Sequence, residues 1–135
     1  MKHLVSISLL IMSCTLCTFA IAKATPEISQ DQLLSLQAAA KAPKFIVLDV
    51  RSDEEYMSGH IPNAVNISHD QLTDKLSLLS QKLAGDKSTL IVVHCRSGRR
   101  AAMAEEILRY SGFSQVRHLT GDIKAWQQSN LPITK

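Results

Sequence analysis

The sequence predicts a single α/β domain, in which a parallel β-sheet carries helices on both faces. Two apolar runs, residues 45–50 and 89–94, are nearly unbroken, as expected of strands that are covered on both sides. Segments with helical periodicity alternate with these runs, and that alternation is typical of parallel sheets. Ligands of such sheets bind beyond the carboxyl ends of the strands, so we expect the functional residues at that edge.

The first half of the domain is predicted to begin with a helix. Ser29 and Gln32 match a capping box, and the apolar residues that follow at helical spacing extend the helix to about residue 40. The buried strand over residues 45–50 comes next. Ser52 and Glu55 match a second capping box, which predicts a short helix that a glycine ends.

The second half continues the alternation. A stripe of leucines at helical spacing over residues 72–83 predicts a helix before the second buried strand. A further helix is predicted over residues 100–111, because its apolar residues share one face and a glycine follows it. The remaining predicted elements are strands over residues 64–67 and 115–119 and a short helix over residues 121–128.

The first 24 residues differ in composition from the rest of the chain. They hold 16 of the 61 apolar residues, two of the three cysteines and no acidic residue. A positively charged start precedes an apolar run that closes with small residues, which is typical of a signal peptide cut after Ala22 or Ala24. We therefore expect residues 1–24 to be a signal peptide that directs export to the periplasm of a bacterial envelope.

Two other interpretations of this segment remain open. An apolar run of about 19 residues is marginally long enough to span a bilayer, so the segment could be retained as an anchor. Lipidation at Cys14 is less favoured, because Met12 suits such a site poorly. After cleavage, no stable membrane anchor is expected.

Residues 25–135 are expected to form the whole domain. They carry 13 basic and 12 acidic residues, a balance that gives no whole-surface argument for binding nucleic acid or an anionic membrane. A chain of 111 residues buries enough apolar surface to fold without disulfides. Its single cysteine, Cys95, indicates either intermolecular pairing or a reactive thiol if the protein is exported.

Cys95 opens a loop with the features of an anion-binding site. It follows the buried strand directly, Gly98 turns the chain, and a helix begins at about Arg100. Backbone N–H groups at a helix start lack intrahelical acceptors and can hold an anion. A cysteine among these amides and beside Arg96, Arg99 and Arg100 is expected to be a thiolate, because each neighbour favours the charged form. We favour this reactive site over the alternative of a small buried side chain beside a solvated basic face.

Several ordered motifs make the chain resemble the rhodanese domain. They are LDVR at residues 48–51, EY at 55–56, GHIPNA at 59–64, CRSGRR at 95–100, and the segment 121–126 followed by LP at 131–132. The resemblance extends over residues 27–133, and it is greatest to the small single-domain exported members of the family.

The resemblance implies sulfur transfer through a Cys95 persulfide. The thiolate would attack the outer sulfur of thiosulfate or a similar donor, release sulfite, and pass the sulfur to a thiol (including a protein thiol) or to cyanide. The loop amides would stabilise the persulfide, and no metal or organic cofactor would be needed. The implied substrate site consists of Arg96, Ser97, Gly98, Arg99 and Arg100. We prefer Arg96 and Arg99 as ligands of the donor, while Arg100 could point outward.

The residues around the loop have less direct roles. Asp49 and Arg51 end the first buried strand at the same edge, and the resemblance implies that they support the loop by hydrogen bonds rather than react. His118 is expected at the surface, in no metal-binding spacing. Trp126 is expected to fill the edge of the core.

Three alternatives to the sulfurtransferase remain. Phosphatases and arsenate reductases with a C-x5-R loop place an arginine six residues after the cysteine, where this chain has Ala101, so the loop is one residue short for phosphate. A sulfur carrier or interaction module without catalysis, and a thiol redox sensor, are the other two.

Overall fold

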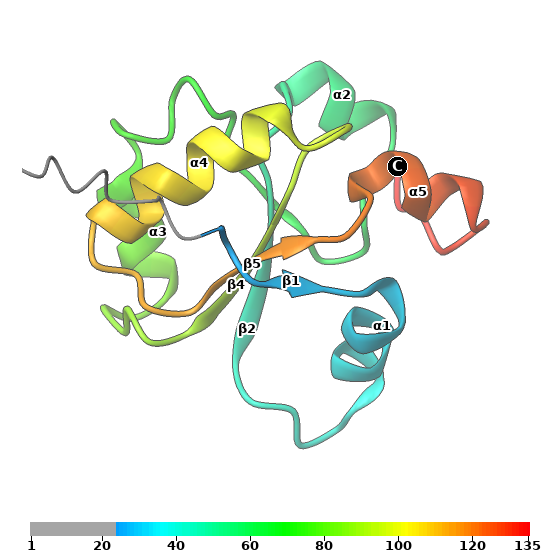
Figure 1. The fold of residues 1–135 in the computed structure, drawn as a ribbon, viewed down its shortest axis with the longest axis horizontal. Coiled ribbons are helices and arrows are strands. Elements are labelled where there is room, and N and C mark those ends of the chain that lie inside the picture. Colours follow the sequence, from blue (N-terminus) through cyan, green and yellow to red (C-terminus); the bar gives the residue numbers. More distant parts are fainter. Residues whose placement is uncertain (1–23) are drawn as a thin grey trace, which may run out of the picture.

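A five-stranded parallel sheet forms the centre of the computed structural model, which describes residues 24–135 (Figure 1). The strands are β1 (Glu27–Ile28), β2 (Phe45–Asp49), β3 (Val65–Asn66), β4 (Leu90–His94) and β5 (Val116–Leu119). They lie in the order β1-β5-β4-β2-β3, and every pair is parallel. The segment that follows the central strand β4 is therefore flanked by the ends of β2 and β5.

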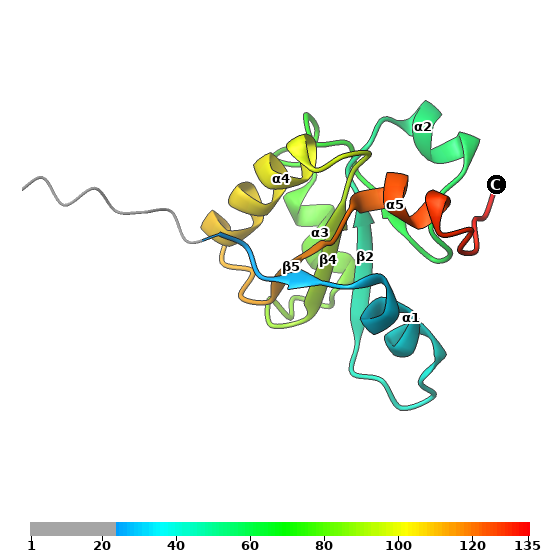
Figure 2. The same ribbon diagram turned by 45° about the vertical axis from the view of Figure 1, so that its right-hand side comes forward.

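Five helices complete the described fold (Figures 1 and 2). They are α1 (Gln30–Ala38), α2 (Asp53–Ser58), α3 (Leu76–Lys82), α4 (Arg99–Tyr110) and α5 (Asp122–Gln128). Helices α3 and α4 cover one face of the sheet, and α1 and α5 cover the other. The predicted fold class, a parallel sheet with helices on both faces, is confirmed.

The core consists of two apolar clusters, one on each face of the sheet. Alternate residues of β4 divide between them: Val93 packs with α3 and α4, whereas Val92 packs with α1 and α5. Trp126 belongs to the second cluster, is fully buried, and donates its indole N–H to the carbonyl of Pro132 at 2.9 Å. Because β4 packs in both clusters, the core holds the end of this strand and the start of the loop that follows it.

Two elements differ from the sequence prediction. Strand β1 was not predicted, because two residues give no recognisable apolar pattern; it pairs with β5, with Glu27 opposite His118. The helix predicted from residue 72 begins at Leu76, after a series of turns, although Leu72 is fully buried. No side chain caps α3 at Lys75, so the leucine stripe alone does not mark its start.

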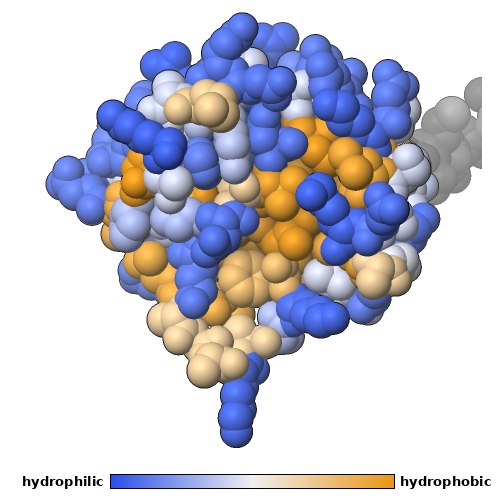
Figure 3. Space-filling model, turned by 180° about the vertical axis from the view of Figure 1, so that it is seen from behind, coloured by the Kyte–Doolittle hydropathy of each residue, from blue (hydrophilic) through white to orange (hydrophobic). Residues whose placement is uncertain are grey.

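Seen from behind, the surface has a hydrophobic area that is surrounded by hydrophilic residues (Figure 3). The large apolar side chains that are exposed come from three different helices and are Met57, Leu78, Met103 and Tyr110. Single exposed apolar residues of this kind are ordinary on a folded domain.

The expected signal peptide lies outside the described residues, apart from Ala24. Within residues 24–135, no helix is both long enough and apolar enough to cross a bilayer.

Candidate active site

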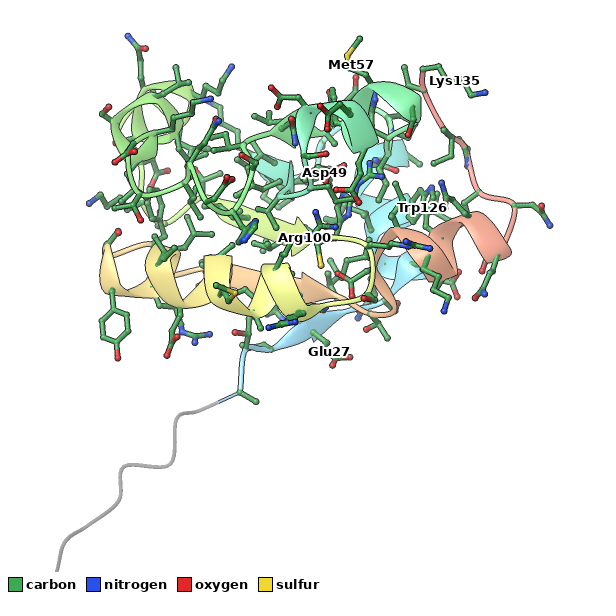
Figure 4. The ribbon with its side chains drawn as sticks, turned by 90° about the horizontal axis from the view of Figure 1, so that it is seen from above. Glu27, Asp49, Met57, Arg100, Trp126 and Lys135 are labelled. Atoms are coloured by element: carbon green, nitrogen blue, oxygen red, sulfur yellow. The ribbon has the colours of Figure 1, made fainter. Side chains whose placement is uncertain are left out.

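The carboxyl ends of the three central strands bring Cys95, Asp49, Arg51 and Asp122 to one edge of the sheet. Cys95 follows β4, Asp49 ends β2, and Asp122 begins α5 just after β5. All four residues are at least 95% buried, and three of them, Asp49, Arg51 and Asp122, carry side chains that are rarely buried. Figure 4 shows Asp49 and Arg100 in the middle of the fold, whereas Met57 and Lys135 lie at its periphery.

The sulfur of Cys95 is held by the turn of its own loop. The N–H of Gly98 donates to Cys95 Sγ at 3.1 Å, and Cys95 is only 1% exposed. Gly98 adopts a φ of 105°, a conformation that L side chains rarely reach. The loop is short, since α4 begins at the next residue, Arg99. Gly98 therefore allows the chain to turn back and direct an N–H at the sulfur.

The outer side of the loop is fixed by α5. The N–H of Ile123 donates to the carbonyl of Cys95 at 3.2 Å, and the N–H of Lys124 donates to the carbonyl of Arg96 at 3.2 Å. The C=O and N–H of a trans peptide point in opposite directions, so the N–H groups of Arg96 and Ser97 point away from α5. Neither N–H donates to another described residue. Two backbone donors, together with that of Gly98, are thus available to an anion at this loop.

The backbone of Cys95 is anchored by a buried chain of charged side chains. Its N–H donates to Asp122 Oδ1 at 2.8 Å, Asp122 Oδ2 lies 2.9 Å from His118 Nε2, and His118 Nδ1 contacts Glu105 Oε1. The hydrogen bonds to Asp122 and then to Glu105 raise the pKa of His118 to about 10. The expectation that His118 lies at the surface is wrong: its side chain is 16% exposed and bridges two carboxylates.

Asp49 and Arg51 form a buried ion pair beside the loop. Arg51 Nε donates to both carboxylate oxygens of Asp49 at 3.0 Å, and Arg51 Nη2 donates to Asp49 Oδ2 at 2.6 Å and to the carbonyl of Gly59 at 2.9 Å. No hydrogen bond joins either side chain to residues 95–100 in the described part of the chain. The pair instead contacts His94, whose Nε2 lies 3.7 Å from Asp49 Oδ2.

His94 and Cys95 face opposite sides of the sheet end. Cys95 packs in the cluster with α3 and α4, while the His94 ring is fully buried beside Asp49. Burial lowers the pKa of His94, and its Nε2 has no hydrogen-bond partner among the described residues. The ring is turned away from the sulfur, so it is not placed to act as its base.

The arginines of the loop divide into two groups. Arg96, Ser97 and Arg99 are exposed, and Arg96 and Arg99 form no ion pair with a described residue. Arg100 does not point outward: it forms a two-point ion pair with Glu55 of α2, with N–O distances of 2.5 and 2.9 Å. The Glu55 hydrogen bond is the main cause that raises the pKa of Arg100, and the Cys95 side chain contributes. Arg100 is therefore fixed by Glu55, and its positive charge interacts with the Cys95 side chain.

Four residues of this site were not identified from the sequence: Glu55, Glu105, His118 and Asp122. Asp122 could have been found, since it follows a predicted strand at the same sheet edge as Cys95. The other three act through side-chain pairs between distant segments, which no local pattern reveals. Within residues 24–135, no three His, Cys, Asp or Glu side chains converge in a way that could hold a metal ion.

Known proteins with a similar sequence and fold identify the family of this domain. A family model described as "Rhodanese-like domain" matches residues 29–129. A solved protein from Anabaena sp., Alr3790, is 29% identical with a TM-score of 0.68, over 79% of this chain and 80% of that one. The human single-domain sulfurtransferase TSTD1 is 28% identical with a TM-score of 0.63, over 78% of this chain and 97% of that one.

Other proteins with a similar sequence are named as tRNA uridine(34) hydroxylases and not as sulfurtransferases. A tRNA uridine(34) hydroxylase from Sodalis glossinidius is 33% identical over 88 residues, which is 65% of this chain and 25% of the hydroxylase. A second hydroxylase of this name, from Erwinia tasmaniensis, is 35% identical over 81 residues. The chain spans about a quarter of the length of the curated relatives it matches.

Proposed function

The chain belongs to the rhodanese-like domain family, and on that premise we propose that it is a sulfurtransferase that takes sulfane sulfur from thiosulfate or a donor of the same kind. The observation that carries the proposal is the Gly98 N–H directed at Cys95 Sγ. In the same loop, the N–H groups of Arg96 and Ser97 point away from α5. An anion on or beside that sulfur would meet three backbone donors.

The proposed reaction has two displacements. The Cys95 thiolate attacks the outer sulfur of thiosulfate, a new S–S bond forms, and the old S–S bond breaks with its electron pair leaving on sulfite. An acceptor thiolate or cyanide then attacks the outer sulfur of the persulfide, and the Cys95 thiolate leaves. Each step moves one sulfur between nucleophiles and needs no general base, which is consistent with the position of the His94 ring beside Asp49 and away from the sulfur.

The charges of the loop suit a dianionic donor. The charge of Arg100 interacts with the Cys95 side chain, while Arg96 and Arg99 are exposed and free to bind an anion that enters from solvent. Glu55 already holds Arg100 at two points, so this arginine would meet the donor in a fixed orientation. We therefore propose Arg100 as the inner and Arg96 and Arg99 as the outer ligands of the donor.

Phosphoryl transfer is less well supported. The position six residues after Cys95 is Ala101, which is fully buried within α4 and offers no donor. The helix begins four residues after the cysteine, so the loop ends before the position at which a C-x5-R loop places its arginine. The similarity to tRNA uridine(34) hydroxylases accounts for a quarter of those proteins, and no feature of the described site favours hydroxylation.

Thiosulfate turnover tests the proposal. Purified protein mixed with thiosulfate and cyanide should form thiocyanate, and Cys95→Ser should form none. The same protein should not hydrolyse an aryl phosphate. Phosphatase activity that depends on Cys95, without thiocyanate formation, would overturn the assignment. A disulfide or sulfenic acid on Cys95 after mild oxidation, again without thiocyanate, would favour the redox sensor.

We also propose that the protein is exported, on the strength of the apolar segment at residues 1–24. Its test is the N-terminal sequence of the protein recovered from the periplasmic fraction of a bacterial host. A start at residue 23 or 25 is expected, whereas an intact Met1 in the membrane fraction would favour the anchor.

A further inference from the structure

Glu105, His118 and Asp122 form a buried array that ends on the nucleophile. The array crosses three elements, from α4 through β5 to the start of α5, and its last hydrogen bond is the 2.8 Å contact from the N–H of Cys95 to Asp122 Oδ1. Glu105 and Asp122 are 4% and 3% exposed. Nothing in the two displacements requires these side chains to touch the donor.

Asp122 occupies a backbone conformation that disfavours it. Its φ is 55°, directly after Gly121 at a φ of 77°, so the chain passes through two left-handed residues in succession. Such a conformation costs an L-residue about 1 kcal/mol or more, whereas glycine adopts it freely. An aspartate thus occupies a position better suited to glycine, and its two carboxylate oxygens contact the N–H of Cys95 and the ring of His118.

The same array also lies against the turn of the loop. A Cβ on Gly98 would come within 3.2 Å of Asp122 Oδ2 and 3.6 Å of the His118 ring. Gly98 supplies the N–H that holds Cys95 Sγ. The Cys95 backbone is therefore bound to the same group of side chains that lies close beside the Gly98 turn.

The array is charged but internally paired. Glu105 from α4 and Asp122 from α5 face His118 from β5, and Asp122 also interacts with His94 and with the backbone N–H of Cys95. Burial alone would raise the pKa of Asp122, but the hydrogen bonds from His118 and from the N–H of Cys95 hold it below its usual value. A buried carboxylate kept ionised in this way is a strong and stationary acceptor.

We propose that Asp122, fixed by His118 and Glu105, is a positioning residue that holds the Cys95 peptide so that the loop amides stabilise the sulfur anion. This inference rests on the proposed role of Cys95 as nucleophile. It assigns Asp122 no contact with the donor, and it predicts that the acceptor oxygen at this position matters more than its charge.

Two substitutions of Asp122 distinguish the effect of losing the hydrogen-bond acceptor for the Cys95 N–H from the effects of losing the charge or changing the backbone conformation. Asp122→Asn removes the charge, tolerates a positive φ and keeps an oxygen for the Cys95 N–H. Asp122→Gly also removes the charge and adopts the same φ, but offers no acceptor. Asn130→Gly is the matched control, because Asn130 has a φ of 53° and lies exposed at the far end of α5.

The first measurement is the rate at which iodoacetamide alkylates Cys95, followed on the Cys95 peptide by mass spectrometry across a range of pH. The midpoint of the rate profile should lie about one pH unit higher in Asp122→Gly than in Asp122→Asn, as expected for the loss of one hydrogen bond at the nucleophile. A midpoint is independent of the limiting rate, so a change in access to the buried sulfur does not imitate the effect. Asn130→Gly should keep the wild-type midpoint.

The second measurement is thiosulfate turnover by the same proteins. Asp122→Gly should lose about tenfold in kcat relative to Asp122→Asn with little change in KM. Coincident alkylation midpoints for the two variants, with both folded by urea titration, would overturn the positioning role. Absence of thiocyanate formation by the wild-type protein would overturn the proposed function instead, while the alkylation profiles would still decide the role of Asp122.

Discussion

Arg100 and Glu55 form a two-point ion pair that ties the first turn of α4 to α2. Their N–O distances are 2.5 and 2.9 Å, and the two side chains are 27% and 33% exposed. The Arg100 hydrogen bond lowers the pKa of Glu55 to about 2. The pair fixes the Arg100 guanidinium on Glu55, while Arg99, its neighbour in sequence, is exposed to solvent. Two arginines that are adjacent in the sequence thus have different surroundings: Arg100 is paired with Glu55, and Arg99 is exposed.

Replacing these arginines should separate their contributions. Arg100→Ala is expected to raise the KM for thiosulfate about tenfold, because it removes a charged donor that Glu55 holds in a fixed orientation. Arg99→Ala should raise the KM about threefold, since an exposed charge is screened by solvent. Stability should change by less than about 1 kcal/mol in both variants, because a partly exposed ion pair contributes little. Steady-state kinetics and urea unfolding measure the two effects, and a larger KM for Arg99→Ala would reverse the proposed order.

Gly98 and Gly85 offer a matched pair of alanine substitutions. Both have a positive φ, 105° and 76°, so alanine should cost each position about 1 kcal/mol of unfolding free energy through the backbone alone. A Cβ at Gly98 also meets Asp122 Oδ2 at 3.2 Å, whereas nothing lies within 4 Å of one at Gly85. Gly98→Ala should therefore lose most of its thiosulfate turnover and Gly85→Ala should retain it. Equal turnover in the two variants would contradict the loop geometry.

The buried pair of Asp49 and Arg51 should be important for stability. Arg51→Met is expected to lower the free energy of unfolding by about 3 kcal/mol, because Asp49 is left as an unpaired charge in the interior. The double variant Asp49→Asn and Arg51→Met should lose less than the sum of the two single variants, since the buried charge is gone. Urea unfolding of all three gives the coupling, and strictly additive losses would show that the two side chains act independently.

His118 should make stability depend on alkaline pH. Its pKa is raised from 6.5 to about 10, first by the Asp122 hydrogen bond and then by that of Glu105. A raised pKa in the folded state means that the folded protein holds this proton more tightly. The resulting stability is fully present below pH 6.5 and is lost as the pH rises through about 10. Unfolding free energies at pH 6, 8 and 10 should fall, on the order of 3 kcal/mol in total, and His118→Gln should remove most of this slope. If the unfolding free energy of His118→Gln depended on pH as strongly as that of the wild-type protein, another titratable group would be its cause.

The sequence predicts the sheet and the position of the nucleophile because both depend on local patterns. The apolar runs at residues 45–50 and 89–94 define the central strands, and a cysteine after the second run must lie at the carboxyl edge. The start of α3 and the two residues of β1 escape prediction because neither has a distinctive cap or apolar pattern.

The support of the loop was harder to predict, because it depends on side-chain pairs between distant segments. Glu55 and Arg100 are 45 positions apart, and Cys95 and Asp122 are 27 apart. His118 reads as a polar residue of a short strand until Glu105 and Asp122 are placed on either side of it. These pairings arise only when α2, α4 and α5 meet at the end of β4.

The mass of the intact protein after brief exposure to thiosulfate tests the central claim most directly. We expect the wild-type protein to gain one sulfur atom, located on Cys95 by peptide mapping, and to lose it as thiocyanate when cyanide is added. Cys95→Ser should gain nothing. A wild-type protein whose mass is unchanged, or a Cys95→Ser protein that gains the same sulfur, would contradict sulfur transfer through this residue.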